Sequence, residues 1–151
     1  MTRMSSKRLL ELRYIFAMTK WIFLLLLFVK PAYADWHFIG KSSDFGMYAD
    51  PSSIQRRGAL VKMWAMGDYK DTQSVRLPQP LLWTNYLSVK ELKEFDCNSG
   101  LHRTVRTAIF AGRQAKGEPI YTFDTGAPFV QVANAPLDIA QFKFACEGGT
   151  R

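Results

Sequence analysis

The sequence of 151 residues contains few of the groups that usually carry catalysis or bind metal ions. It has two histidines and two cysteines, but no Gly-x-Ser-x-Gly segment, no glycine-rich phosphate loop and no His-Glu-x-x-His segment. His37 and His102 each lie within a predicted strand, and neither has further ligands at the spacing of a metal site. We therefore expect a protein that is not an enzyme and that has no metal site or other cofactor.

One group of nearby acidic residues has a pattern that does not favour acid–base chemistry. Glu91, Glu94 and Asp96 are interleaved with Lys90 and Lys93. Alternate residues of a strand point to opposite sides, so these carboxyl groups are not expected to converge on one substrate. We interpret the stretch as the solvated face of a strand.

The sequence has no apolar run long enough to cross a membrane. The longest run, from Trp21 to Val29, has nine residues, whereas a membrane-spanning helix needs about 20. It follows a lysine, and Ala32 and Ala34 then supply the small-x-small pattern that a signal peptidase recognises. We predict that residues 1–34 are a signal peptide, cleaved before Asp35, and that the protein is exported.

Two alternatives to this interpretation stay open. Met18 is an alternative translation start, because a signal peptide that begins at Met1 would be long for a bacterial protein. The apolar residues 15–18 could instead extend the run into a retained N-terminal anchor. No cysteine follows the predicted cleavage site, so we expect no lipid anchor. The exported protein would lie in the periplasm or at the outer membrane and cell surface.

Positive charge is concentrated in the predicted signal. Residues 1–34 hold six basic residues and one acidic residue, which leaves 14 basic and 12 acidic residues in 35–151. A nucleic-acid-binding domain usually has a much larger excess of basic residues, clustered on one face. We therefore exclude DNA and RNA as partners.

The exported part has two cysteines, Cys97 and Cys146. In an exported chain an even number of cysteines favours a disulfide, whereas a zinc site needs three or four clustered ligands. Neither cysteine belongs to a Cys-x-x-Cys segment typical of redox activity. We predict a structural disulfide within one domain, residues 35–151.

Short β-rich segments separated by turn residues dominate this domain. A proline begins its one predicted helix, residues 136–146, whose apolar face would include Ile139, Phe142 and Cys146. Residues 70–85 contain Pro78 and Pro80 and are predicted to form a long irregular loop. The expected fold is α+β, with an antiparallel sheet of about six strands and the helix packed on it. The predicted strands are 36–39, 47–49, 60–69, 86–97, 101–111 and 120–123, the third of them central.

The order of several short motifs resembles that of the surface-adhesin protein E-like family. The most specific are Tyr48-x-Asp50-x-x-Ser53-Ile54, the strand end Glu94-x-Asp96-Cys97, and the C-terminal Cys146. The resemblance covers nearly all of residues 35–151. It implies a small α+β domain of the kind described above. Through the founding member, it also implies an outer-membrane adhesin that binds host matrix and plasma proteins and can dimerise.

From these features we expect an exported, non-enzymatic binding domain for a protein ligand or envelope partner. The expected binding surface is a solvated sheet face with Lys90, Lys93, Arg103 and Arg106, and an exposed sheet edge would allow a homodimer. His102 beside Arg103 and Arg106 would add to a cationic spot. One alternative is a periplasmic structural or envelope accessory protein with no host ligand. Another is a carrier of haem or a small molecule.

Overall fold

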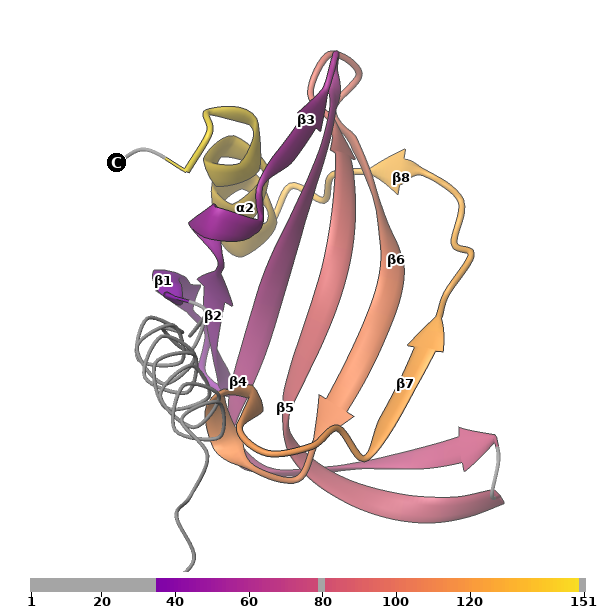
Figure 1. Ribbon diagram of the computed structural model, residues 1–151. Coiled ribbons are helices and arrows are strands. Elements are labelled where there is room, and N and C mark those ends of the chain that lie inside the picture. The colour runs from indigo at the N-terminus through magenta and orange to yellow at the C-terminus, as the bar shows by residue number, and fades with distance from the viewer. Residues whose placement is uncertain (1–34, 79–80, 150–151) are drawn as a thin grey trace, which may run out of the picture. The chain divides into compact units, whose positions relative to one another are not determined.

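The computed structural model describes residues 35–78 and 81–149 (Figure 1). The predicted signal peptide, residues 1–34, lies outside these ranges, so its cleavage stays a prediction. Within the described ranges, no helix is both long and apolar enough to cross a membrane.

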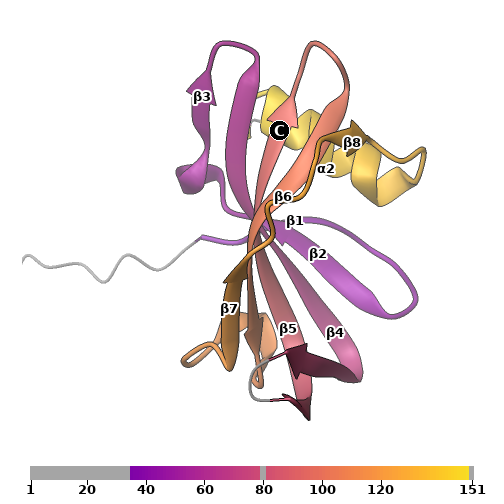
Figure 2. The same cartoon turned by 90° about the vertical axis from the view of Figure 1, so that its right-hand side faces the viewer.

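The described residues form an antiparallel sheet of eight strands and one α-helix, which confirms the predicted α+β class. The main path of the sheet has six strands in the order β1-β2-β4-β5-β6-β7, while β3 pairs with β4 and β8 with β6. Figure 2 shows that the long strands twist strongly along their length. The strands are β1 (His37–Lys41), β2 (Phe45–Ala49), β3 (Gln55–Arg57), β4 (Leu60–Pro78), β5 (Leu81–Asp96), β6 (Leu101–Phe110), β7 (Tyr121–Asp124) and β8 (Val130–Gln131).

The predicted loop over residues 70–85 is wrong. β4 continues to Pro78 and β5 begins at Leu81, so most of this segment belongs to one long hairpin. Pairing is irregular between Asp68 and Gln73 and then resumes as far as Pro78 opposite Leu81. Pro78 is the last residue of its strand, where a missing backbone N–H removes no interior hydrogen bond. The proline signal therefore marked the end of the hairpin and not an irregular loop.

The segment between β2 and β4 is a compact turn. Pro51–Ser53 forms a short 3-10 helix, η1, and the side chain of Asp50 accepts a hydrogen bond from the backbone N–H of Ser52 at 3.0 Å. The backbone N–H of Trp64 donates to the Ser53 hydroxyl at 2.9 Å and so ties η1 to β4. Gly58 then reverses the chain with a φ of 61°, a conformation that costs glycine little.

The predicted helix is confirmed as α2 (Pro136–Cys146), with Pro136 in its first turn. The predicted buried face of this helix is wrong in part. Gln141, Phe144 and Ala145 are the buried residues, whereas Phe142 and Cys146 contact the edge of the core. The apolar residues of α2 recur on more than one helical face, so their spacing alone did not fix its rotation on the sheet.

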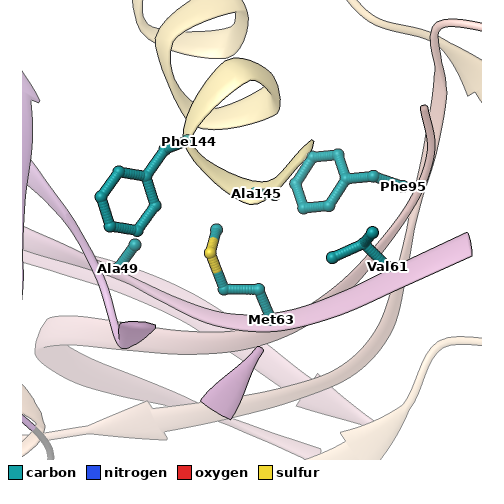
Figure 3. Packing of buried hydrophobic residues seen from close by; sticks show 6 residues of the cluster. All are labelled: Ala49, Val61, Met63, Phe95, Phe144 and Ala145. Carbon is teal, nitrogen blue, oxygen red and sulfur yellow. The ribbon is translucent and has the colours of Figure 1, made fainter. Parts of the chain in front are cut away.

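The core lies between α2 and one face of the sheet. Figure 3 shows Phe144 and Ala145 of the helix above Ala49, Val61, Met63 and Phe95 of the strands. The predicted disulfide joins Cys97, just after β5, to Cys146 at the end of α2. Covalent and apolar contacts thus hold the helix against the same strands.

A second set of buried contacts fixes the segment after β6. It contains the short helix η2 (Arg113–Ala115), in which Gln114 and Ala115 have positive φ. Buried Ser88 donates to the carbonyl of Gly112 at 2.6 Å and accepts from the N–H of Ala115 at 2.9 Å. Asp68 accepts from the N–H of Gln114 at 2.8 Å. These bonds offset the cost of a left-handed backbone at residues that are not glycine.

Candidate functional site

The sheet face opposite α2, called here the open face, carries most of the predicted binding residues. Val61 and Phe95 point toward the helix, so the alternating neighbours Lys62 and Glu94 point to the other side. Pairing places Lys62 opposite Glu94 and Glu94 opposite Arg103. A row of charged side chains therefore crosses three strands on the open face.

Glu94 is the centre of that row. It is 5% exposed and accepts a hydrogen bond from Nε of Arg103 at 2.7 Å, while Nζ of Lys62 lies 3.6 Å from its other carboxylate oxygen. The Arg103 guanidinium also lies 4.6 Å from the centroid of the Phe129 ring. The prediction that Glu94 belongs to a solvated stretch is therefore wrong, because its cross-strand partners cover it.

Lys90 lies against two tryptophans. Its Nζ is 4.5 Å from the centroid of the Trp64 ring and 5.6 Å from that of the Trp36 ring. Such contacts hold an ammonium group near the surface while leaving its charge available to a partner. Trp36 precedes β1 in the sequence, so its contact with β5 arises only in the folded chain.

Arg106 forms an exposed ion pair with Asp124 of β7. Its Nε donates to Oδ1 at 2.6 Å and its second terminal nitrogen donates to Oδ2 at 3.3 Å. This hydrogen bonding raises the pKa of Arg106 and lowers the pKa of Asp124. Arg103 and Arg106 are three residues apart and would point to opposite sides of a regular strand. They share the open face because β6 has an extra residue at Val105, where the pairing with β5 shifts.

Lys93 does not belong to this face, and its predicted place is wrong. It lies on the α2 side, is 8% exposed, and donates from Nζ to Oε1 of Gln141 at 3.0 Å. Glu91 lies 3.6 Å from the same ammonium group. Lys90 and Lys93 are an odd number of residues apart in a strand without a bulge of its own, so this separation already indicated opposite faces.

The two histidines pack on phenylalanine rings. The imidazole of His102 is stacked on Phe95 with centroids 6.2 Å apart, and that of His37 is stacked on Phe144 at 4.9 Å. Burial is the main cause that lowers the pKa of His102, and the positive charge of Lys93 lowers it further. His102 lies opposite Phe95 and so on the α2 side, away from Arg103 and Arg106, and the predicted cationic spot of the three residues is therefore wrong. No three metal-binding side chains converge within 35–78 and 81–149.

Sequence reasoning missed further residues of the open face. Gln55, Arg57, Leu60, Lys62 and Glu94 line a cavity of about 200 Å³ between β3 and the β4–β5 pair. With Arg57 included, the face has five basic side chains and three acidic ones, Glu94, Asp96 and Asp124, while Asp68 on the same side is paired with Arg113. No local sequence pattern indicates that β3 pairs with β4, and it is this pairing that brings Arg57 opposite Leu60.

Comparison with solved structures finds the same fold in Haemophilus influenzae protein E. One structure has 17% sequence identity and a TM-score of 0.51, and the match covers 80% of this chain and 92% of that one. The structure of its selenomethionine form also has 17% identity and a TM-score of 0.51, with 78% and 92% covered. No curated protein sequence was found to match this chain.

The family comparison covers most of the sequence and confirms the resemblance seen in its motifs. Residues 36–147, from the tryptophan beside Lys90 to the residue after Cys146, match the sequence model of surface-adhesin protein E. Because this match spans well over half of the chain, the protein belongs to the surface-adhesin protein E family.

Proposed function

We propose that this protein is an exported, non-enzymatic adhesin domain that binds an acidic surface of a host matrix or plasma protein through its open face. The family match over residues 36–147 carries the adhesin assignment. The excess of basic over acidic side chains on the open face supports the choice of an acidic partner surface. Arginine and aromatic side chains, here Arg103, Trp64 and Phe129, are the groups that most often dominate protein interfaces.

The proposal requires the protein to lie outside the outer membrane. Protease added to intact cells should then cleave it, and the intact mass of the recovered protein should correspond to residues 35–151 with the disulfide formed. Protection until the outer membrane is opened would contradict the adhesin proposal and favour a periplasmic accessory protein instead.

The binding surface can be tested by removing two of its cations. We expect Lys90→Ala with Arg106→Ala to weaken binding to immobilised matrix or plasma proteins by roughly tenfold, mainly through a slower association rate that depends on salt. Lys143→Ala removes an exposed cation of α2 and is the matched control. Equal loss in the control, or unchanged binding in the double variant, would exclude the open face.

A homodimer formed through a sheet edge is a separate part of the proposal. β1 and β7 end the main path of the sheet, and an outer strand has backbone groups free to pair with another strand. Light scattering across a concentration series measures the molar mass directly. A monomer at the highest concentration would contradict the dimer but not the use of the open face.

A further inference from the structure

The end of the β4–β5 hairpin carries an unusual concentration of exposed apolar side chains. Leu81 is 67% exposed, Leu82 43% and Trp83 70%. No other three consecutive residues within 35–78 and 81–149 include large apolar side chains that are all this exposed. Figures 1 and 2 show that this end of the hairpin extends beyond the neighbouring strands β6 and β7. Grouped exposure of this kind usually marks an interaction surface.

Pairing within the hairpin determines which side chains act together. Pro78 lies opposite Leu81, and Arg76 lies opposite Trp83. Residues opposite each other in an antiparallel pair share a face, so Leu81 and Trp83 lie on the same side as Arg76. Leu77, on the other side opposite Leu82, is 4% exposed and is already covered. One side of the hairpin end is therefore both apolar and basic.

The charge around this surface favours an anionic partner. The stretch from Thr72 to Val89 contains a single charged residue, the basic Arg76. An arginine next to exposed leucine and tryptophan is the combination found where proteins meet an anionic membrane surface, because tryptophan prefers the headgroup level and arginine pairs with lipid phosphate.

We propose that this surface, formed by Arg76, Pro78, Leu81 and Trp83 and called here the hairpin tip, docks on an anionic phospholipid bilayer. The tip is the convex end of a projecting element. A fluid bilayer accepts such a wedge without a surface of matching shape, whereas a protein partner would have to supply one. Leu81 and Trp83 enter the interface while Arg76 contacts a phosphate. The open face is made of other residues, so docking of the tip does not depend on the proposed adhesin function.

Sedimentation with lipid vesicles tests this docking. The probes are vesicles of phosphatidylcholine with and without phosphatidylglycerol, mixed with the full chain as recovered from cells, its N-terminus fixed by intact mass. We expect binding that requires phosphatidylglycerol and weakens with salt. Leu81→Ser with Trp83→Ser should lower the partition coefficient by roughly tenfold or more, because two apolar side chains no longer leave water.

Two further variants make the result specific to the hairpin tip. Trp83→Phe should retain binding but lose most of the fluorescence quenching by lipids with brominated tails, because the remaining tryptophans of the domain, Trp36 and Trp64, lie against Lys90. Phe123→Ser with Val130→Ser removes exposed apolar side chains elsewhere and should change little.

Three outcomes would overturn the proposal. The first is no sedimentation with vesicles that contain phosphatidylglycerol. The second is equal binding by the Leu81→Ser, Trp83→Ser variant and the unaltered chain. The third is a dimer in light scattering that this variant dissociates, without vesicle binding, which would assign the tip to a second copy of the chain. Each variant is expected to fold, because the substituted side chains are exposed, and melting curves check this.

Discussion

Glu94 and Asp124 show how burial separates two ion pairs of similar chemistry. The carboxylate of Glu94 is nearly covered and contacts Arg103 and Lys62, whereas the side chain of Asp124 is 66% exposed beside Arg106. A covered carboxylate has lost most of its hydrating water and is stabilised mainly by its charged partners. In an exposed pair, water can solvate each group when the other is removed, so the pair contributes little to stability.

Glu94→Gln should therefore lower the free energy of unfolding by about 1–3 kcal/mol, because it leaves Arg103 and Lys62 without their shared anion. Asp124→Asn is the matched control and should change it by less than about 1 kcal/mol. Urea unfolding of both variants measures the difference. A larger loss in Asp124→Asn would contradict the assignment of Glu94 as the central residue of the open face.

His102 should make stability depend on pH. Its pKa is lowered from 6.5, mainly by burial and next by Lys93, against the weaker opposing charges of Asp138 and Glu91. The unfolded chain then binds the proton more readily than the folded chain. The stabilisation from neutral His102 is therefore present above about pH 6.5 and is lost as the pH falls below that value.

The change in urea midpoint between about pH 8 and pH 5 checks this dependence. We expect His102→Phe to lose less stability on acidification than the unaltered protein, since phenylalanine can stack on Phe95 without titrating. The other titrating groups are common to both proteins and cancel in the comparison. Equal losses in the two would show that His102 is protonated as easily in the folded protein as in the unfolded chain.

At the scale of elements, the long hairpin and η2 depend on each other. Asp68 of β4 and Ser88 of β5 form hydrogen bonds with backbone groups of Gly112, Gln114 and Ala115, at and just before η2. Propensity did not predict this arrangement, because Gln114 and Ala115 adopt a conformation that sequence rules assign to glycine. Tertiary hydrogen bonds therefore decide the local backbone here.

Ser88→Ala should lower the free energy of unfolding by about 1–3 kcal/mol, because it leaves the carbonyl of Gly112 and the N–H of Ala115 without their buried partner. Amide hydrogen exchange at Ala115 should become faster in the same variant. Ser74→Ala removes an exposed hydrogen bond to Asn85 and should cost less than about 0.5 kcal/mol. Unchanged exchange at Ala115 would mean that Ser88 does not hold η2.

At the scale of the whole molecule, the disulfide joins the end of β5 to the end of α2. Cys97 and Cys146 are 49 residues apart, and a loop of this length corresponds to roughly 4 kcal/mol in the chain-entropy account. That is a large part of the total stability of a small domain. The bond also lies beside the apolar cluster under α2.

Cys97→Ala with Cys146→Ala should therefore lower the free energy of unfolding by about 2–5 kcal/mol and expose α2 to protease before the sheet. Reduction of the unaltered protein with dithiothreitol should produce the same early cleavage at α2. An equal urea midpoint with and without the bond would show that apolar packing alone holds the helix.

The class of the fold, the disulfide, the helix and the family could all be predicted from the amino-acid sequence. These features depend on local patterns: apolar alternation, two cysteines in a chain predicted to be exported, a proline at a helix start, and short motifs in order. The motif order alone identified the family that the match over residues 36–147 then showed. Three of the four binding candidates, Lys90, Arg103 and Arg106, lie on the open face, and their role in binding stays a prediction.

The remaining features could not be predicted from the sequence, because they depend on pairing between segments that are distant in the chain. The bulge in β6 turned Arg106 to the side of Arg103, and the rotation of α2 buried Gln141 against Lys93. Register between β4 and β5 extended the hairpin to Leu81 and exposed Trp83. None of these has a local signal in the chain, since each is the lowest-energy arrangement of contacts that form only when the sheet is assembled.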